Sequence, residues 1–203
     1  VSFDNNIGHD YLLNYEERYE FYHKKEEKIE FDLEYFNKIT KGGLPNKTLN
    51  IALAGTGVGK SLFMCHVASS VLLQGRNVLY ITMEMAEEKI AERIDANLLD
   101  VSIQDLTDLP KLMFENKVTD VSKKTQGQLI IKEYPTAGAH SGHFKTLLNE
   151  LSLKKSFKPD IIFIDYLNIC ASSRYRAAAN VNSYSYIKAI AEELRGLAVE
   201  ANV

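Results

Sequence analysis

The sequence has 203 residues, of which 45% are hydrophobic and 25% are charged, proportions typical of one soluble globular domain with a substantial core. No apolar run approaches the ~20 residues of a membrane-spanning helix, and the N-terminus lacks the basic-then-apolar pattern of a signal peptide. Cys65 and Cys170 lie in apolar segments without metal-ligand spacing, which favours reduced core cysteines in a cytoplasmic protein.

The N-terminal segment is acidic and aromatic. Residues 1–34 hold ten acidic and four basic side chains, a net charge of −6 against −3 for the whole chain, so the remainder carries +3. The acidic segment is poorly suited to grip nucleic acid, whereas the positive remainder permits it. Within residues 9–28, tyrosines at spacings of four, four and three share one face of a predicted helix: Tyr11, Tyr15, Tyr19 and Tyr22. This face packs either in the core of its own domain or on a neighbouring subunit, and both interpretations remain open.

A glycine-rich segment carries the first chemical signal. An apolar run at residues 50–54 predicts a buried strand, and a helix is predicted from residue 60 to about residue 74. Strand, glycine loop and helix in this order form the context of a P-loop, although Ala54 replaces the first glycine of G-x-x-x-x-G-K-[ST]. The alternative is a glycine-rich turn that binds nothing. The predicted nucleotide-binding residues are Gly55, Thr56, Gly57, Val58, Gly59, Lys60 and Ser61.

The residue types of this loop suit phosphate. Glycines let the backbone fold tightly and aim successive N–H groups at phosphate oxygens, and the helix N-terminus adds a partial positive charge. Lys60 can reach the β- and γ-phosphates, and the Ser61 hydroxyl can ligate Mg²⁺. The loop therefore predicts a nucleoside triphosphate with Mg²⁺.

Downstream of the loop, strand and helix patterns alternate. Strands are predicted at residues 77–83, 128–134 and 160–165, and helices at residues 86–99, 102–125 (broken near Pro110), 139–157 and 185–201. The chain ends on what reads as the start of a further strand, so we expect a fragment of a longer βα series.

Two carboxylates follow predicted strands. Asp165 ends one strand and Glu84 ends another, which places both at the ligand edge of a parallel sheet. Asp165 can hold the Mg²⁺ shell beside Ser61, and Glu84 can orient a water for attack on the γ-phosphate. The alternative for Asp165 is an aspartate that only caps the following turn. The alternative for Glu84 is an acid that is stabilised by the dipole at the N-terminus of the next helix.

A polar, basic loop follows the strand that ends at Asp165. It contains Arg174 and Arg176, which either contact nucleic acid or form a solvated surface.

Three stretches have informative sequences: residues 81–93 read ITMEMAEEKIAER, residues 164–168 read IDYLN and residues 187–194 read IKAIAEEL. The first resembles the segment after the second core strand of DnaB-like replicative helicases, the second is similar to the I-D-Y-L-Q stretch of that family, and the third matches its next helix. The likeness is greatest to the family members of T-even bacteriophages.

The resemblance implies an α/β fold: a RecA-like P-loop NTPase core at residues 31–203, with a mostly parallel sheet flanked by helices. A linker helix within residues 1–30 would precede this core and dock on a neighbouring subunit. By the same resemblance, the protein is an ATP-driven motor that works as a homo-hexameric ring, translocates on single-stranded DNA and unwinds duplex DNA. Primase and a helicase loader are the implied partners, in the cytoplasm of the host cell if the gene belongs to a phage.

The resemblance also assigns roles to residues. Lys60 and Ser61 would hold phosphate, Ser61 and Asp165 would hold Mg²⁺, and Glu84 would activate water. By the same resemblance, we expect the arginine finger, the sensor residue and the main DNA-binding loop of the family to lie beyond residue 203.

Other P-loop proteins share part of this pattern. A RecA-type recombinase shares the fold and a catalytic glutamate, but the IDYL sequence at residues 164–167 and the acidic N-terminal helix favour a helicase. A small-metabolite kinase usually carries an arginine-rich lid, and only three arginines follow Lys154. A GTPase lacks support because residues 116–119 break the N-K-x-D motif at its fourth position. A nucleotide-binding clamp that never hydrolyses is disfavoured by Glu84.

Overall fold

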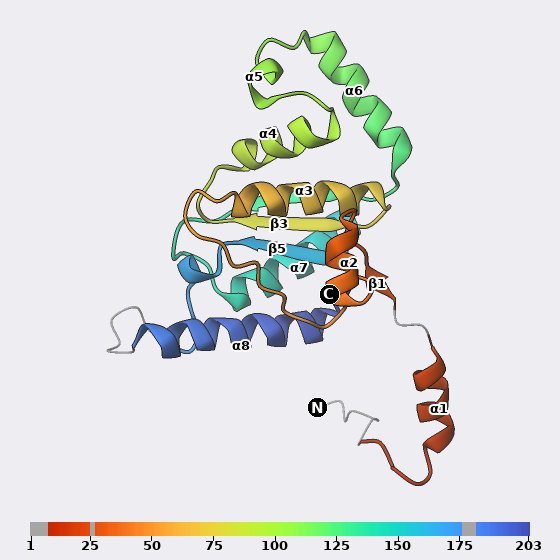
Figure 1. The fold of residues 1–203 in the computed structure, drawn as a ribbon. Coiled ribbons are helices and arrows are strands. Elements are labelled where there is room, and N and C mark those ends of the chain that lie inside the picture. The colour runs from red at the N-terminus through yellow and green to blue at the C-terminus, as the bar shows by residue number, and fades with distance from the viewer. Residues whose placement is uncertain (1–7, 25–26, 176–181) are drawn as a thin grey trace.

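The computed structural model describes residues 8–24, 27–175 and 182–203. Three parallel strands form the central layer of the fold, with α3 and α4 over one face and α7 and α8 over the other (Figure 1). The central strand is β3 (Val78–Thr82), flanked by β4 (Leu129–Glu133) and β5 (Ile161–Asp165). All three strands were predicted from the sequence.

The pleat of β3 divides the core into two clusters. Val78 and Tyr80 pack with α3 (Lys60–Leu73) and α4 (Glu87–Leu98), whereas Leu79 and Ile81 pack with α7 (Ser141–Lys155) and α8 (Ser183–Ala201). Successive side chains of a strand point to opposite faces. Because helices cover both faces, every residue of β3 is buried, which explains its unbroken apolar run.

Smaller elements surround this core. The outlying helices α5 (Ile103–Leu106) and α6 (Lys111–Lys124) are separated at Pro110, as predicted. The two-residue strands β1 (Lys28–Ile29) and β2 (Leu44–Pro45) pair antiparallel around α2 (Glu34–Thr40), and the 3-10 turn η1 (Leu167–Ile169) follows β5. Gly43 has a φ of 115°, and a Cβ there would lie 2.2 Å from the Ile29 carbonyl oxygen, so only glycine fits this position.

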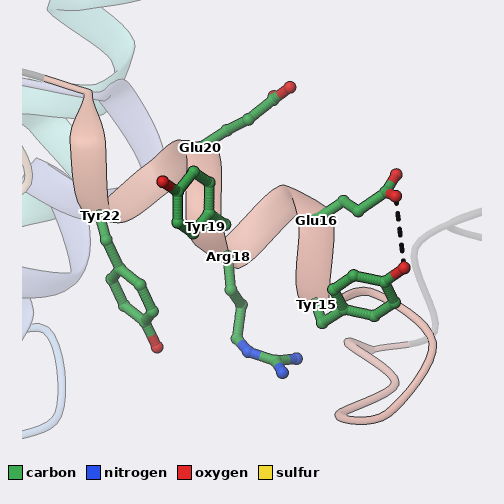
Figure 2. A pocket seen from close by; sticks show the side chains of 6 residues that line it. All are labelled: Tyr15, Glu16, Arg18, Tyr19, Glu20 and Tyr22. Atoms are coloured by element: carbon green, nitrogen blue, oxygen red, sulfur yellow. Dashed lines mark hydrogen bonds between the residues drawn. The ribbon is translucent and has the colours of Figure 1, made fainter.

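The predicted N-terminal helix is present but shorter, as α1 (Tyr15–His23). It lies apart from the sheet (Figure 1) and buries none of its residues. Figure 2 shows its side chains projecting around the helix, and Tyr19 is 64% exposed. The interpretation that the tyrosine face packs in the core of its own domain is therefore wrong. Among the described residues, none of the helices has the length and apolar character that crossing a membrane requires.

The predicted strand at residues 50–54 is not formed. These residues make no regular structure, and Leu53 is 94% exposed. Residues 49–52 line a cavity of about 420 Å³ together with residues of β5, α3 and α8, and no backbone hydrogen bond between described residues joins them to β5. A strand requires a ladder partner, so the apolar run alone did not decide the conformation.

Candidate nucleotide-binding site

The glycine loop lies at the N-terminus of α3. Gly57 and Gly59 have φ values of 76° and 104°, and a Cβ added to either would meet nothing within 4 Å. Their backbone conformation, and not lack of space, therefore favours glycine. Gly59 caps α3, and its carbonyl accepts a 2.9 Å bond from the Phe63 N–H.

The rest of the loop is open to solvent. Its exposed residues are Gly55, Thr56, Gly57 and Val58. The one backbone bond within this stretch runs from the Val58 N–H to the Gly55 carbonyl at 3.4 Å, counting described residues only. The loop therefore presents backbone N–H groups and a helix N-terminus to the solvent, an arrangement that suits an anion.

Two residues predicted from separate motifs meet at this point. The Lys60 Nζ lies 3.3 Å from the Asp165 Oδ1 and 3.8 Å from the centre of the Tyr166 ring. The Asp165 side chain is buried, whereas the Lys60 side chain is 23% exposed. The ammonium thus rests between a carboxylate and an aromatic face, both of which attract a cation. Ser61, the next residue of α3, is half-buried.

The second oxygen of Asp165 has its own partner. The Tyr80 hydroxyl donates to Asp165 Oδ2 at 3.2 Å, and the Cys65 thiol donates to the Tyr80 hydroxyl oxygen at 3.8 Å. Burial raises the pKa of Tyr80, with a further contribution from the nearby Cys65 and Asp165. Burial likewise raises the pKa of the Cys65 thiol. Tyr80 therefore remains a phenol that donates to the carboxylate.

Sequence reasoning missed Tyr80 because a tyrosine in an apolar strand is usually a core residue. The signal that could have identified it is the hydroxyl group, because the other residues of β3 before Thr82 are all aliphatic.

The donor set fits Mg²⁺. Asp165 Oδ1 is buried and accepts no hydrogen bond from the described residues, so its one contact is the ion pair with Lys60. Mg²⁺ prefers oxygen ligands and is commonly held by one or two carboxylates together with substrate phosphates. Asp165 and the Ser61 hydroxyl supply such oxygens from β5 and α3. Within the described part of the chain, no group of three or more His, Cys, Asp or Glu side chains could hold a metal.

Glu84 lies just beyond the end of β3, at the same sheet edge as Asp165. Thr82 is in register with Asp165, and the Met83 N–H donates to the Asp165 carbonyl at 3.0 Å. Glu84 is exposed, and no hydrogen bond or ion pair with another described residue involves its carboxylate.

The helix-dipole interpretation applies better to Glu87 than to Glu84. Glu87 lies in the first turn of α4, and its carboxylate accepts a 2.8 Å bond from the Glu133 N–H. Glu84 precedes Ala86, the N-cap residue of that helix. Its carboxylate is thus left for another role.

The loop after β5 is attached to α8. Arg174 forms a surface ion pair with Glu192 at 2.5 Å, while Arg176 lies outside the described residues. Glu193, which sequence reasoning missed, accepts bonds from the Ser141 hydroxyl and from both the backbone and side chain of Ser173.

The hydroxyl of Ser172 is a further donor to Glu193, at 2.6 Å. Burial raises the pKa of Glu193, but the bonds from the three serines outweigh it and lower the pKa to about 2. The carboxylate therefore stays charged and links the loop to α7 and α8.

Comparison with known proteins adds an independent observation. The family model of the DnaB-like helicase C-terminal domain matches residues 29–203. This chain belongs to that family. The DnaB-like assignment made from three short motifs is thus confirmed over nearly the whole chain.

The DnaB-like relatives are longer than this chain. The DnaB-like replicative helicase of Enterobacteria phage T4 is 52% identical over 203 residues, which are 98% of this chain and 42% of that protein. The chain thus spans less than half the length of this curated relative. Such identity confirms the expected likeness to T-even phage helicases.

Two solved structures show the same fold. One is a DnaB-like replicative helicase studied for its interactions with primase, and the other is an ATPase domain. Each has a TM-score of 0.68 and 18% sequence identity over 95% of this chain, and the matched parts are 45% and 66% of those chains respectively. The predicted α/β, RecA-like fold is confirmed.

Proposed function

We propose that this chain is the ATP-driven motor domain of a replicative DNA helicase. The observation that carries the proposal is the approach of Lys60 to Asp165 at the N-terminus of α3, in a chain of the DnaB-like helicase family. A lysine that meets a buried acid beside an open glycine loop is the constellation that phosphoryl transfer needs.

Each predicted residue has a role in the proposed reaction. The N–H groups of the glycine loop bind the phosphates of ATP, and Lys60 leaves Asp165 to neutralise the γ-phosphate. Asp165 and Ser61 would hold Mg²⁺, which when bound would neutralise charge that develops on the phosphate oxygens. Glu84 accepts a hydrogen bond from water and orients it toward the γ-phosphate.

Nucleotide binding also exchanges partners around the buried acid. Asp165 loses the Lys60 ammonium as a partner but keeps the hydrogen bond from Tyr80. A buried carboxylate without a counter-charge is unfavourable, so Asp165 would need another positive charge beside it once nucleotide draws Lys60 away.

The wider assembly is part of the proposal. Residues 1–30 would form the linker arm, because the α1 tyrosines are exposed and need a surface to cover them. A neighbouring subunit of a homo-hexamer would supply that surface, and residues 31–203 would form the ATPase domain. Arg174 and Arg176 are proposed to contact single-stranded DNA, with Arg174 exchanging Glu192 for a phosphate. Primase and a loader are proposed partners in the cytoplasm.

The test is the ATPase rate of the complete protein encoded by the reading frame that contains this chain, with and without single-stranded DNA. Strong stimulation by DNA, together with unwinding of a forked duplex, is the expected result. Turnover that ignores DNA and rises instead with a small phosphate acceptor would overturn the proposal in favour of a kinase.

A further inference from the structure

The turn that carries Glu84 is held by its own strand. Thr82, the last residue of β3, is fully buried, and its hydroxyl bonds to both backbone groups of Met85. The Thr82 Oγ1 donates to the Met85 carbonyl at 2.8 Å and accepts from the Met85 N–H at 3.1 Å. These two bonds span Glu84 and fix the backbone on its C-terminal side.

A second hydroxyl fixes the N-terminal side of Glu84. Thr136, from the segment after β4, donates to the Met83 carbonyl at 2.8 Å. The Met83 N–H is itself bonded to the Asp165 carbonyl at 3.0 Å, and the Met83 side chain is buried. Both flanks of Glu84 are therefore anchored, one to β3 and one to the neighbouring strands, while its carboxylate stays exposed.

We propose that Thr82 and Thr136 are positioning residues for Glu84. They hold the turn so that the carboxylate projects at the sheet edge beside Asp165, where a water can be oriented. The inference rests on the proposed role of Glu84 as the residue that orients water.

The physical reason is the sensitivity of such a role to distance. A glutamate on an unanchored bend would sample many positions, and a misplacement of about 1 Å can cost roughly a hundredfold in rate. The anchoring bonds reach the main chain on either side and leave the carboxylate unpaired, which a base requires.

The first test is Thr82→Val in the complete protein, a change that replaces the hydroxyl with a methyl group of similar size. The expected result is a fall in kcat of roughly tenfold to a hundredfold with an unchanged dissociation constant for ATP. Thr82→Ser keeps the hydroxyl and is expected to retain most of the activity. Thr136→Val removes one bond instead of two and should produce a smaller fall in kcat.

The matched control is Thr119→Val on α6. Its hydroxyl also donates one 2.8 Å bond to a backbone carbonyl, that of Glu115, but far along the chain from the site elements. This control is expected to leave both kcat and ATP affinity unchanged.

A double-mutant cycle separates positioning of Glu84 from a general structural role. In a Glu84→Gln background, Thr82→Val should cause no further fall in kcat, because the residue it positions is already inactive. Equal falls in both backgrounds, or a kcat for Thr82→Val equal to that of the parent, would overturn the inference.

If Thr82→Val does not fold, the same cycle is run with Thr136→Val. A Glu84→Gln variant that hydrolyses ATP at the parent rate would instead overturn the proposed role of Glu84 itself. A fall in Glu84→Gln without a fall in either threonine variant would overturn the positioning role alone.

Discussion

The two sides of the candidate nucleotide site are built differently. On the carboxylate side, Asp165, Tyr80 and Thr82 are fully buried. The Tyr80 hydroxyl donates to Asp165 across β3 and β5, and the Thr82 hydroxyl bonds to the Met85 backbone. On the phosphate side, residues 55–58 are exposed, and one backbone bond of 3.4 Å lies within this stretch among the residues that the structure describes.

The difference follows from what each side must bind. A buried carboxylate or hydroxyl is unfavourable unless protein groups compensate it, and here Tyr80 donates to Asp165 Oδ2 while the Lys60 ammonium faces Oδ1. Backbone N–H groups of an exposed loop are satisfied by water and can exchange it for phosphate oxygens. We therefore expect substitutions of the groups that satisfy the Asp165 carboxylate to affect folding as well as binding, and those on the loop to affect binding alone.

The largest expected effect comes from Lys60→Ala, because the Lys60 side chain contacts the carboxylate side and lies at the end of the phosphate-binding loop. The change removes the positive charge that binds phosphate and leaves the buried Asp165 without its ion-pair partner. We expect ATP affinity to fall by about a hundredfold or more, by isothermal titration calorimetry, together with a lower melting temperature. The control is Lys132→Ala, which removes a half-exposed lysine from β4. Equal ATP affinity in Lys60→Ala and the parent would contradict the site.

The next effect isolates the carboxylate side. Tyr80→Phe removes the hydroxyl that donates to Asp165 Oδ2 but keeps the ring that stacks on Phe163. Loss of a group that orients a metal ligand typically weakens metal binding by about tenfold to a hundredfold. Mn²⁺ binding in the presence of a non-hydrolysable ATP analogue, followed by electron paramagnetic resonance, measures this change.

Tyr134→Phe is the matched control for Tyr80→Phe. The Tyr134 ring packs against Phe144 in the opposite core cluster, away from Asp165. Tyr134→Phe should leave Mn²⁺ affinity unchanged, and the same loss in both variants would show that the effect is not specific to the hydroxyl bonded to Asp165.

Glu193 binds the loop after β5 through Ser172 and Ser173. Because the pKa of its carboxyl is lowered in the folded state, we expect the stability of the fold to depend on pH. The pKa of Glu193 in the folded state is about 2, below its ordinary value of 4.5, so ionised Glu193 stabilises the fold above pH 4.5. This contribution is lost as the pH falls from 4.5 through 2, because the folded carboxylate becomes protonated.

We expect Glu193→Gln to lower the melting temperature at pH 7 and the difference from the parent to shrink as the pH falls below 4.5. The control is Glu192→Gln, which removes an exposed carboxylate paired with Arg174 and should have little effect on stability. A difference for Glu193→Gln that stays constant from pH 7 to pH 3 would contradict this assignment.

The smallest effect on the domain is expected from Tyr19→Ala in α1, which belongs to neither side of the site. Tyr19 is 64% exposed, so the free energy of unfolding of the ATPase domain should change by less than about 0.5 kcal/mol. Sedimentation of the complete protein should instead show weaker self-association, because the tyrosine face loses contact area. A lower melting temperature with unchanged assembly would contradict the docking of α1 on a neighbouring subunit.

Several features of the fold and site were predictable because they depend on nearby residues. Apolar runs of five or so residues marked β3, β4 and β5, and the polar residues at their ends marked Asp165 and Glu84. The glycine positions marked the loop, since Gly57 and Gly59 adopt a backbone conformation that other residues rarely take.

Other features were not predictable because they depend on which strands become neighbours. The apolar run at residues 50–54 predicted a strand, yet this segment has no ladder partner among the described residues and is exposed. Tyr80, Thr82 and Thr136 looked like ordinary strand and loop residues. Their roles emerged only when β3 lay between β4 and β5.

The sequence by itself determined the kinds of groups available and their order: a glycine loop, a lysine at the start of a helix, and acids after buried strands. These follow from local backbone preference and from the period of apolar residues. The tertiary structure decided which groups meet. The parallel register of β3 and β5 sets Thr82 beside Asp165, and the packing of α3 over β3 brings Lys60 and Tyr80 to the same carboxylate. Such contacts join residues far apart in the chain, so no local pattern can specify them.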